Sequence, residues 1–381
     1  DLHIGKQVNG FPLIEDQRFA LEAVLAAARD HSVDALLLAG DLYDKSSPSA
    51  EAVCLLDWFF TEVATAGLPC YAIPGNHDSA ERVAYVSGLL TRQGIHLAPI
   101  FDGRVTHHSL EDEHGPVTFW LLPFMKPAHV RAFFPDADIG QDYTAALRTV
   151  LADCPLETSQ RNVLIAHQFV TSGTAEPERS DSELSVGGLD NVDASVFADF
   201  DYVALGHIHR PQRIGRDEVR YAGSLLKYSF SEIKYPKSAT LVELGPKGTI
   251  SITLLPLEPL HDMREIKGPL ASLLADDVVT ASKSDDYLHV VLTDEDPAID
   301  ALARIRAAYP NAMAVDYDNT RTRTQTDTTR NAPDISQTDP LELFERFYLQ
   351  QNGEELSDEQ RELAHKAFES ALSNTAQEVL S

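Results

Sequence analysis

A short apolar run that ends in Gly-Asp constrains the fold of this chain more than any other feature. Residues 35–39 are apolar without alternation, and Gly40 and Asp41 follow them. Such a run predicts a strand that is buried on both faces, as in a sheet covered by helices. An amphipathic helix expected at residues 17–30 fits such an α/β layer. Asp41 then lies at the carboxyl end of the strand, where open α/β sheets place their ligands.

Three more buried strands are expected to end in polar residues. They cover residues 69–73, 162–166 and 202–205. One strand-terminal Asp or His is usually a turn former or a helix cap, but four such ends indicate a shared site. The polar side chains that follow the four strands are those of Asp41, Asn76, His167, His207 and His209.

The first residues of the chain add another pair of candidates. Asp1 and His3 are two residues apart, so both side chains face the same side if the backbone is extended. An apolar strand normally precedes such a pair. We therefore expect the first strand of the sheet to be missing from this chain.

The candidate ligands offer oxygen and imidazole nitrogen but no sulfur. Mixed shells of this kind suit Mn²⁺, iron or Zn²⁺ rather than a thiolate site. The set exceeds the needs of one tetrahedral site, so we predict two metal ions, with the two oxygens of Asp41 as the bridge. Paired metals about 3.5–4 Å apart clamp the attacking and leaving oxygens of a displacement at phosphorus. The predicted metal ligands are Asp1, His3, Asp41, Asn76, His167, His207 and His209.

Together these motifs resemble the calcineurin-like metallophosphoesterases. The patterns D-x-H, G-D-x-x-D, G-N-H-D and G-H-x-H begin at Asp1, Gly40, Gly75 and Gly206. The chain is also similar to the SbcD family, the nuclease subunits of the bacterial SbcCD complex, most clearly in segments 1–6, 40–44, 73–78 and 221–224. This resemblance implies an α/β fold: a four-layer β-sandwich flanked by helices, a small α+β capping domain and a C-terminal helix pair.

The resemblance implies roles for single residues as well. One metal, usually Mn²⁺ in this family, would be held by Asp1, His3, Asp41 and His209. The other would be held by Asp41, Asn76, His167 and His207. His77 would give a proton or a hydrogen bond to the leaving oxygen, and Asp44 would orient the His77 imidazole. A helix N-cap is the alternative role for Asp44.

Charge limits how the chain could meet DNA. Its formal net charge is −28, which argues against a protein that coats nucleic acid by itself. An enzyme that meets phosphates through metals and a local basic patch is still allowed. Residues 203–237 are locally basic, and Arg210 in this segment is a candidate substrate-binding residue. An ordinary charged surface is the alternative.

The sequence carries no sign of a membrane segment or a disulfide framework. No apolar run approaches the roughly 20 residues that a membrane helix needs. Cys54, Cys70 and Cys154 are scattered without a C-x-x-C pair, so a thiolate zinc site is not indicated either. A reducing cytoplasm is the simplest compartment for such a chain.

Four parts are expected along the chain. They are a nuclease domain at 1–262, an α+β capping domain at 263–318, a flexible linker at 319–338 and a helical segment at 339–381. A capping box from Ser357 to Gln360 opens the second of two short helices in the last part. Helices this short must dock on the chain's own body or on a partner. The resemblance implies an SbcC-like coiled-coil ATPase as that partner of 339–381, and a homodimer of this chain.

The first hypothesis is therefore a metal-dependent DNA nuclease. It would act as an exonuclease on duplex ends and an endonuclease on single strands or hairpins, in DNA repair, recombination and replication. A phosphatase or cyclic-nucleotide phosphodiesterase on the same core is the alternative, because function lives in parts grafted onto a fold. The capping domain, linker and helix pair favour the nuclease. A scaffold that has lost its metals is a third class, and the presence of every candidate ligand counts against it.

Overall fold

The computed structural model describes residues 1–183, 190–282 and 284–320, and isolated positions from 322 to 364. The chain forms two compact units. The larger consists of Asp1–Leu292 and Pro297–Asp316, and the smaller of Thr293–Asp296 and Tyr317–Ser381. Within the described residues, no helix is both long enough and apolar enough to cross a membrane.

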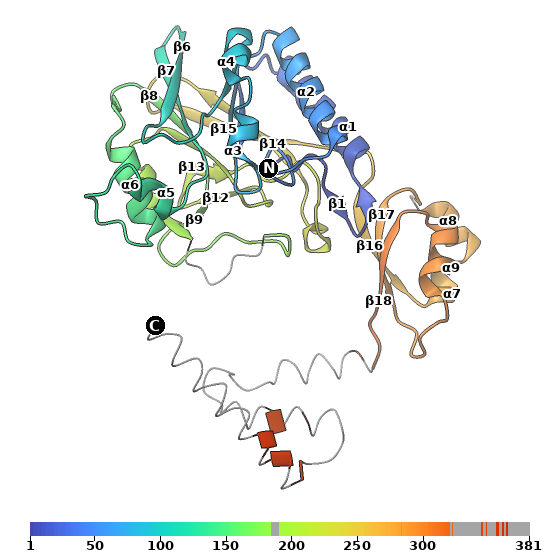
Figure 1. Ribbon diagram of the computed structural model, residues 1–381. Helices are drawn as coiled ribbons and strands as arrows, with labels where there is room; N and C mark the ends of the chain where they lie inside the picture. Colours follow the sequence, from blue (N-terminus) through green and yellow to red (C-terminus); the bar gives the residue numbers. More distant parts are fainter. Residues whose placement is uncertain are drawn as a thin grey trace. The chain divides into compact units, whose positions relative to one another are not determined.

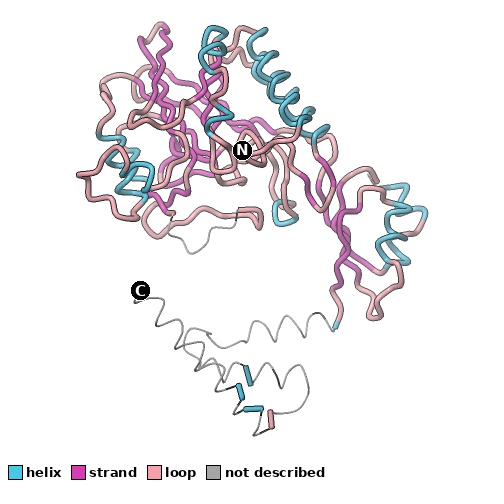
Figure 2. The backbone as a smooth tube through the Cα atoms, in the orientation of Figure 1, coloured by secondary structure: helices cyan, strands magenta, loops and turns pink. Residues whose placement is uncertain are grey.

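Two β-sheets form the centre of the larger unit (Figure 1 and Figure 2). The smaller sheet is parallel and contains β3 (Leu36–Ala39), β4 (Cys70–Ile73) and β5 (Ile95–Leu97). The larger sheet has the order β12-β13-β11-β8-β7-β6. Its parallel central strands are β13 (Arg216–Tyr221), β11 (Tyr202–Gly206), β8 (Arg161–His167) and β7 (Gly115–Leu122). Its antiparallel edges are β12 (Gln212–Ile214) and β6 (Thr106–Asp112).

The strands predicted from unbroken apolar runs are buried on both faces. In β8, Val163 and Ile165 lie in a core cluster that also contains Ile73 of β4. Leu164, between them, lies in a different cluster together with Leu147. Because side chains alternate between the two faces of a strand, a strand covered on both sides needs apolar residues at every position. Strands β3, β4, β8 and β11 confirm the four predictions.

Helices cover the outer faces of the two sheets. Helices α1 (Ile14–Asp30) and α2 (Ala50–Thr65) pack on the smaller sheet through residues such as Leu21 and Phe59. Helices α5 (Pro127–Arg131) and α6 (Tyr143–Ala152) pack on the larger sheet through Val130 and Leu147. The order helix, sheet, sheet, helix confirms the predicted four-layer α/β fold.

The N-cap of α2 tests the alternative role of Asp44. The side chain of Ser49 accepts a hydrogen bond from the backbone nitrogen of Ala52 at 3.2 Å, which is the usual geometry of a Ser cap. Asp44 lies ahead of this cap, so its assignment as a helix N-cap is wrong.

Further elements lie around these layers in the first 262 residues. They are β1 (Gln7–Val8), β2 (Phe11–Pro12), α3 (Ala80–Val83), α4 (Ser87–Leu90), β9 (Phe169–Thr171), β10 (Asn191–Asp193), β14 (Ser238–Leu244) and β15 (Ile250–Pro256). Strands β6 and β7 form an antiparallel hairpin. The β1–β2 hairpin was not predicted. Its turn residues Asn9 and Gly10 have φ angles of 49° and 83°, as in the Asn-Gly turns that commonly close hairpins.

The residues after 262 form a second, smaller αβ layer. Its sheet contains β16 (Met263–Gly268), β17 (Tyr287–Leu292) and β18 (Ala312–Tyr317). Helices α7 (Leu270–Leu273), α8 (Asp276–Ala281) and α9 (Ala301–Ala308) lie on one side of it (Figure 1). Helix α9 begins at Ala301 because Asp300, directly before it, has a φ of 53° and a left-handed residue cannot continue a right-handed helix. Helix α8 was not predicted.

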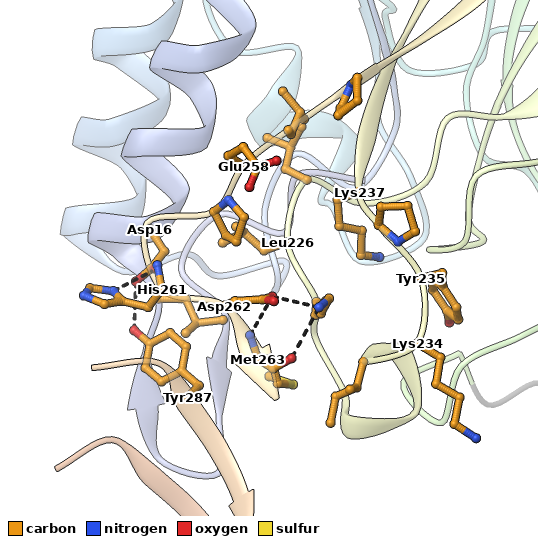
Figure 3. Close-up of a pocket in the computed structure, with 18 residues that line it drawn as sticks. Asp16, Leu226, Lys234, Tyr235, Lys237, Glu258, His261, Asp262, Met263 and Tyr287 are labelled. Atoms are coloured by element: carbon orange, nitrogen blue, oxygen red, sulfur yellow. Dashed lines mark hydrogen bonds and ion pairs between the residues drawn. The ribbon is translucent and has the colours of Figure 1, made fainter. Parts of the chain in front are cut away.

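Asp16 of α1 joins this layer to the rest of the larger unit (Figure 3). Its carboxylate accepts hydrogen bonds from the hydroxyl of Tyr287 at 2.8 Å and from Nδ1 of His261 at 3.0 Å. Beside this junction lies a cavity of about 280 Å³, whose lining includes Tyr235 and Lys237. The α+β layer is therefore tied to the helix that packs behind the smaller sheet.

The smaller unit contains the start of the predicted linker. Asn319 is buried, and its side chain donates to the backbone oxygen of Asp294 at 3.2 Å. The flexibility expected of the linker stays a prediction. Most of the linker at 319–338 and of the helical segment at 339–381 lies outside the described residues. The capping box is confirmed, because the nitrogen of Ser357 donates to Gln360 at 2.9 Å and the nitrogen of Gln360 donates back at 3.3 Å.

Candidate metal centre

The carboxyl end of β3 delivers Asp41 between the two sheets. Gly40, at a φ of 82°, turns the chain, and a Cβ there would lie 2.2 Å from Nδ1 of His167. Asp41 itself has a φ of 48°, a conformation that costs a non-glycine residue roughly 1–3 kcal/mol. Its Oδ2 lies 3.5 Å from Nε2 of His3 and 3.3 Å from Nε2 of His167. One carboxylate oxygen therefore faces two imidazoles from distant parts of the chain.

The first three residues run beside the segment that follows β3. The backbone nitrogens of Leu2 and His3 both donate to the backbone oxygen of Asp41 at 2.9 Å. Nε2 of His3 then lies 3.1 Å from Nε2 of His209. The carboxylate of Asp1 accepts from the backbone nitrogen of His207 at 2.9 Å. This places Asp1 and His3 against the carboxyl end of β11.

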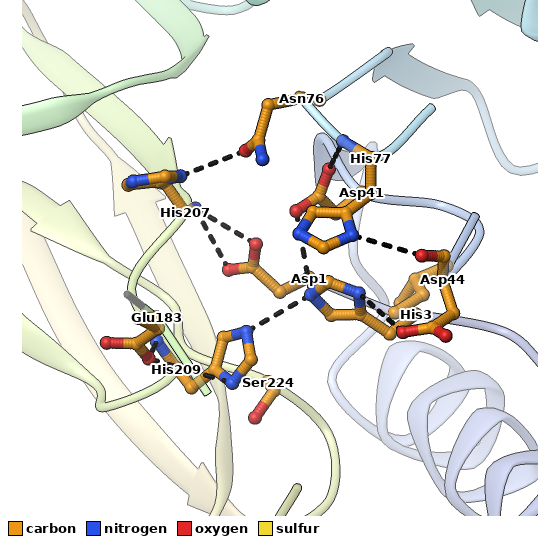
Figure 4. A network of polar contacts seen from close by, with 12 residues as sticks. Asp1, His3, Asp41, Asp44, Asn76, His77, Glu183, His207, His209 and Ser224 are labelled. Atoms are coloured by element: carbon orange, nitrogen blue, oxygen red, sulfur yellow. Dashed lines mark hydrogen bonds and ion pairs between the residues drawn. The ribbon is translucent and has the colours of Figure 1, made fainter. Parts of the chain in front are cut away.

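Asn76 and His207 approach one another beside Asp41 (Figure 4), and His167 joins them there. Oδ1 of Asn76 lies 2.9 Å from Nε2 of His167 and 3.0 Å from Nδ1 of His207. Nδ1 of His167 donates to the backbone oxygen of Ala39 at 2.9 Å, so in the neutral ring Nε2 carries a lone pair. An amide oxygen and an imidazole lone pair at this distance repel one another. A cation bound between them would turn this arrangement into a favourable one.

All seven predicted ligands are thus brought together, and they fit divalent metals. The Nδ1 atom of His3 is buried without a hydrogen-bond partner, which is costly in an apolar interior. Three overlapping groups have ligand atoms within 4.8 Å of one another; they are Asp1, His3 and His209, then Asp1, Asp41 and His167, and then His3, Asp44 and His77. The structure therefore places Asp1 next to both predicted ligand sets rather than one, with its Oδ1 at 3.8 Å from Nδ1 of His167.

Electrostatics keeps these side chains in the protonation states that metal ligands need. Burial lowers the pKa of His3 and of His207 to about 3 and that of His209 to about 4. Burial raises the pKa of Asp41, but its interactions with the neighbouring His167 and His3 outweigh this and hold the pKa of Asp41 well below its usual value. At neutral pH the rings of His3, His207 and His209 are then neutral and Asp41 is ionised, which are the forms that bind divalent metals.

The contact predicted between Asp44 and His77 is made by a different atom. Nδ1 of His77 lies 3.0 Å from the backbone oxygen of Asp44, not from its carboxylate. The carboxylate instead accepts from Nζ of Lys6 at 2.9 Å and lies 3.6 Å from Nδ1 of His3. His77 is exposed at the edge of the site, and its backbone nitrogen donates to Asp41 at 2.9 Å. Asp44 thus contacts His77 through its backbone oxygen, while its carboxylate is hydrogen-bonded to Lys6.

Arg210 is held outside this group of ligands. Its guanidinium forms an ion pair with Glu178 and lies over the ring of Tyr235, 5.0 Å from the ring centre. A contact with substrate would therefore compete with Glu178. The assignment of Arg210 to substrate binding stays a prediction.

Several residues around the site were missed by the sequence reasoning. Asp78 accepts from the backbone nitrogens of Leu42, Tyr43 and Gly75, each at 2.9 Å, and so fixes the two loops after β3 and β4 to one another. Gln17 of α1 donates to the backbone oxygen of His3 at 2.7 Å. Asp78 is the last residue of the G-N-H-D pattern, so the sequence carried a signal for its role. Nothing in the sequence marks Gln17, which is a glutamine within an amphipathic helix.

Two family models match this chain. The calcineurin-like phosphoesterase model matches residues 1–211, more than half of the 381 residues. The SbcD_C model, described as the type 5 capsule protein repressor C-terminal domain, matches residues 259–352. Among solved structures, the crystal structure of TT1561 from Thermus thermophilus is 17% identical over 63% of this chain and 94% of its own, with a TM-score of 0.38.

The first match spans all seven candidate ligands, and the second spans the α+β layer and continues into the helical segment. The four-layer fold and the His and Asp groups at the strand ends agree with the first match. The chain therefore belongs to the calcineurin-like phosphoesterase family, as a metallophosphoesterase of the SbcD type.

Proposed function

We propose that this chain is the nuclease subunit of a DNA-processing complex and hydrolyses phosphodiester bonds with two divalent metals, Mn²⁺ in the cell. The proposed activities are those of an exonuclease on duplex ends and an endonuclease on single strands and hairpins. The observation that carries the proposal is the position of Asp41, whose Oδ2 faces His3 at 3.5 Å and His167 at 3.3 Å. A carboxylate between two ligand groups is the arrangement that a bridged metal pair requires.

The ligands divide into two sets around this carboxylate. Asp1, His3, Asp41 and His209 would hold one metal; Asp41, Asn76, His167 and His207 would hold the other. Bound metals supply the positive charge and the activated water that attack at phosphorus needs. The neutral imidazoles and the ionised Asp41 keep these metals in place.

His77 is the proposed proton donor to the leaving oxygen. The backbone oxygen of Asp44 fixes its Nδ1 at 3.0 Å, which leaves Nε2 to face the substrate. Because His77 is exposed while the ligand residue His167 is fully buried, it lies where a phosphodiester would arrive. A positioned acid of this kind typically contributes ~10²–10⁴ in rate.

The partner is proposed to be an SbcC-like coiled-coil ATPase that binds residues 339–381. The SbcD_C match extends to residue 352, and the apolar Leu363, in the second of the two expected helices, is 70% exposed. We further propose a homodimer within the complex, a role in DNA repair, recombination and replication, and a location in the reducing cytoplasm. The three free thiols Cys54, Cys70 and Cys154 are compatible with that compartment.

The test compares substrates on one preparation. The full chain with Mn²⁺ should cleave a single-stranded DNA oligonucleotide, and p-nitrophenyl phosphate, a monoester, should be a poor substrate. Asp41→Asn should abolish the DNA activity, while Asp57→Asn, an exposed aspartate on α2, should leave it unchanged. Rapid hydrolysis of the monoester without cleavage of DNA would favour a phosphatase instead.

A further inference from the structure

His209 is held from two directions by side chains that the sequence reasoning did not select. Its Nε2 faces His3, while its Nδ1 lies 3.0 Å from the hydroxyl of Ser182 and 3.5 Å from Oε1 of Glu232. Its backbone oxygen accepts from Nζ of Lys237 at 2.8 Å. Both the ring and the main chain of one predicted metal ligand are therefore fixed.

Glu232 and Lys237 also bind one another. Oε2 of Glu232 lies 2.5 Å from Nζ of Lys237, and the two residues are 0% and 5% exposed. A buried ion pair loses so much hydration that it is a weak source of stability compared with apolar packing. Its cost suggests a task other than stability, and both ends of the pair contact His209.

The backbone around this pair is shaped to approach His209 closely. Gly223 has a φ of 82°, and a Cβ there would lie 2.7 Å from the backbone oxygen of His209. The backbone nitrogen of the next residue, Ser224, donates a hydrogen bond to the same oxygen at 3.1 Å. The hydroxyl of Ser224 accepts a hydrogen bond from Nζ of Lys237 at 2.8 Å. The segment 221–224 that stood out in the sequence therefore serves the main chain of His209.

The same stretch of chain also supports the second histidine of this ligand set. The hydroxyl of Tyr228 donates to the backbone oxygen of Leu2 at 2.6 Å, directly before His3. The backbone nitrogen of Tyr228 in turn donates to Oε1 of Glu232 at 3.2 Å. Residues 223–237 thus reach the group formed by Asp1, His3 and His209 from both sides.

We propose that Glu232 and Lys237 are positioning residues for one of the two metals, the one held by Asp1, His3, Asp41 and His209. Glu232 orients the imidazole through Nδ1, and Lys237 fixes the backbone oxygen and neutralises Glu232. Replacing a carboxylate that is hydrogen-bonded to a metal-binding histidine typically lowers metal affinity about 10–100-fold. The inference rests on the two-metal function proposed above.

The experiment measures Mn²⁺ binding to the full chain by isothermal titration calorimetry and by electron paramagnetic resonance of the coupled metal pair. In Glu232→Gln/Lys237→Met both charges are removed, so neither residue leaves an unpaired charge in the interior. One binding site should weaken about 10–100-fold, and the coupled signal should give way to that of a single ion. The melting temperature without metal should stay close to that of the wild type.

Two further variants make the outcome decisive. Lys247→Met is the matched control, because Lys247 also pairs with a carboxylate, that of Asp201 at 2.7 Å, at the end of β11 opposite His207. It should bind both ions as the wild type does. Glu232→Asp keeps both charges but withdraws the carboxylate from His209, so it should weaken the same site to a smaller degree than the double variant.

The failures are distinguishable. A wild-type chain that binds no Mn²⁺ would contradict the proposed function itself. A wild-type chain that binds two ions, with a double variant that binds both equally well, would overturn the positioning role. Equal weakening of both sites, accompanied by a lower melting temperature without metal, would show that the pair only supports the fold.

Discussion

At the scale of single residues, the site depends on side chains held in conformations that their surroundings impose. Asp41 and His3 both have positive φ angles, of 48° and 46°, and both face the same point from different segments. Backbone strain of this kind persists only where the surroundings fix it. Hydrogen bonds between residues 1–3 and the loop after β3 provide that fixation.

His77→Ala tests the division between metal binding and proton transfer. Because no predicted ligand set needs His77, the variant should bind Mn²⁺ with wild-type affinity and cleave DNA ~10²–10⁴-fold more slowly. Calorimetry and single-turnover cleavage measure the two properties separately. Loss of one metal in the variant would show that His77 is a ligand instead.

His108 predicts a pH dependence of stability away from the site. Its ring centre lies 4.0 Å from that of His96, and burial, followed by the charges of His96 and His107, lowers the pKa of His108 from 6.5 to about 4. Between these values the unfolded chain binds more protons than the folded one, so stability is lost as the pH falls through this window. His108→Gln should reduce the decline of the melting temperature from pH 6.5 to 4. An unchanged decline would assign it to other groups.

The ligand residues could be predicted from the sequence because most of them follow a strand whose type is readable from its apolar run. The role of Asp44 could not be predicted from the sequence, because it depends on which atom of Asp44 reaches His77. The structure shows the backbone oxygen there and turns the carboxylate to Lys6. Sequence patterns report residue types and not the direction of a side chain within a loop.

At the scale of elements, the site exists because the ends of β3 and β11 almost touch. A Cβ on Gly206 would lie 1.7 Å from the backbone oxygen of Ala39. The two strands belong to different sheets, so this contact sets the spacing of the two ligand sets. A side chain at position 206 could be accommodated only if the strand ends moved apart.

Gly206→Ala should therefore destabilise the fold and separate the ligands. Overpacking typically lowers the free energy of unfolding by about 1–3 kcal/mol. Because the added Cβ would meet a backbone oxygen, we expect a loss at the upper end of this range or larger. Gly88→Ala in α4 is the control, because nothing lies within 4 Å of its added Cβ, and it should be neutral or up to about 1 kcal/mol more stable. Denaturant unfolding and Mn²⁺ titration measure both effects. Wild-type metal affinity in Gly206→Ala would show that the spacing of the strands is not critical.

Secondary structure was predictable where one strong signal decided it. The buried strands occur as expected, whereas the start of α9 at Ala301 is set by the left-handed Asp300, which no pattern in the sequence marks. The α+β layer was recognised as a layer, but its attachment was not. That attachment depends on Asp16 meeting His261 and Tyr287, residues far apart in the sequence that carry no shared pattern.

At the scale of the whole molecule, catalysis and partner binding are assigned to different parts of the chain. Deleting residues 339–381 should abolish binding to the ATPase and ATP-stimulated cleavage of duplex DNA. Metal-dependent cleavage of single strands should continue, because every predicted ligand lies within residues 1–209. Pull-down and a melting curve of the truncated chain measure the two consequences. A truncated chain that melts much lower yet still binds the ATPase would indicate that the helices stabilise this chain's own fold.

The most direct test of the central claim, a two-metal centre bridged by Asp41, is anomalous diffraction at the manganese edge from crystals of the chain grown with Mn²⁺. We expect two peaks roughly 3.5–4 Å apart, with the carboxylate of Asp41 between them. His3 and His209 should lie at one peak, and His167 and His207 at the other. A single peak, or a pair of peaks that Asp41 does not touch, would contradict the claim.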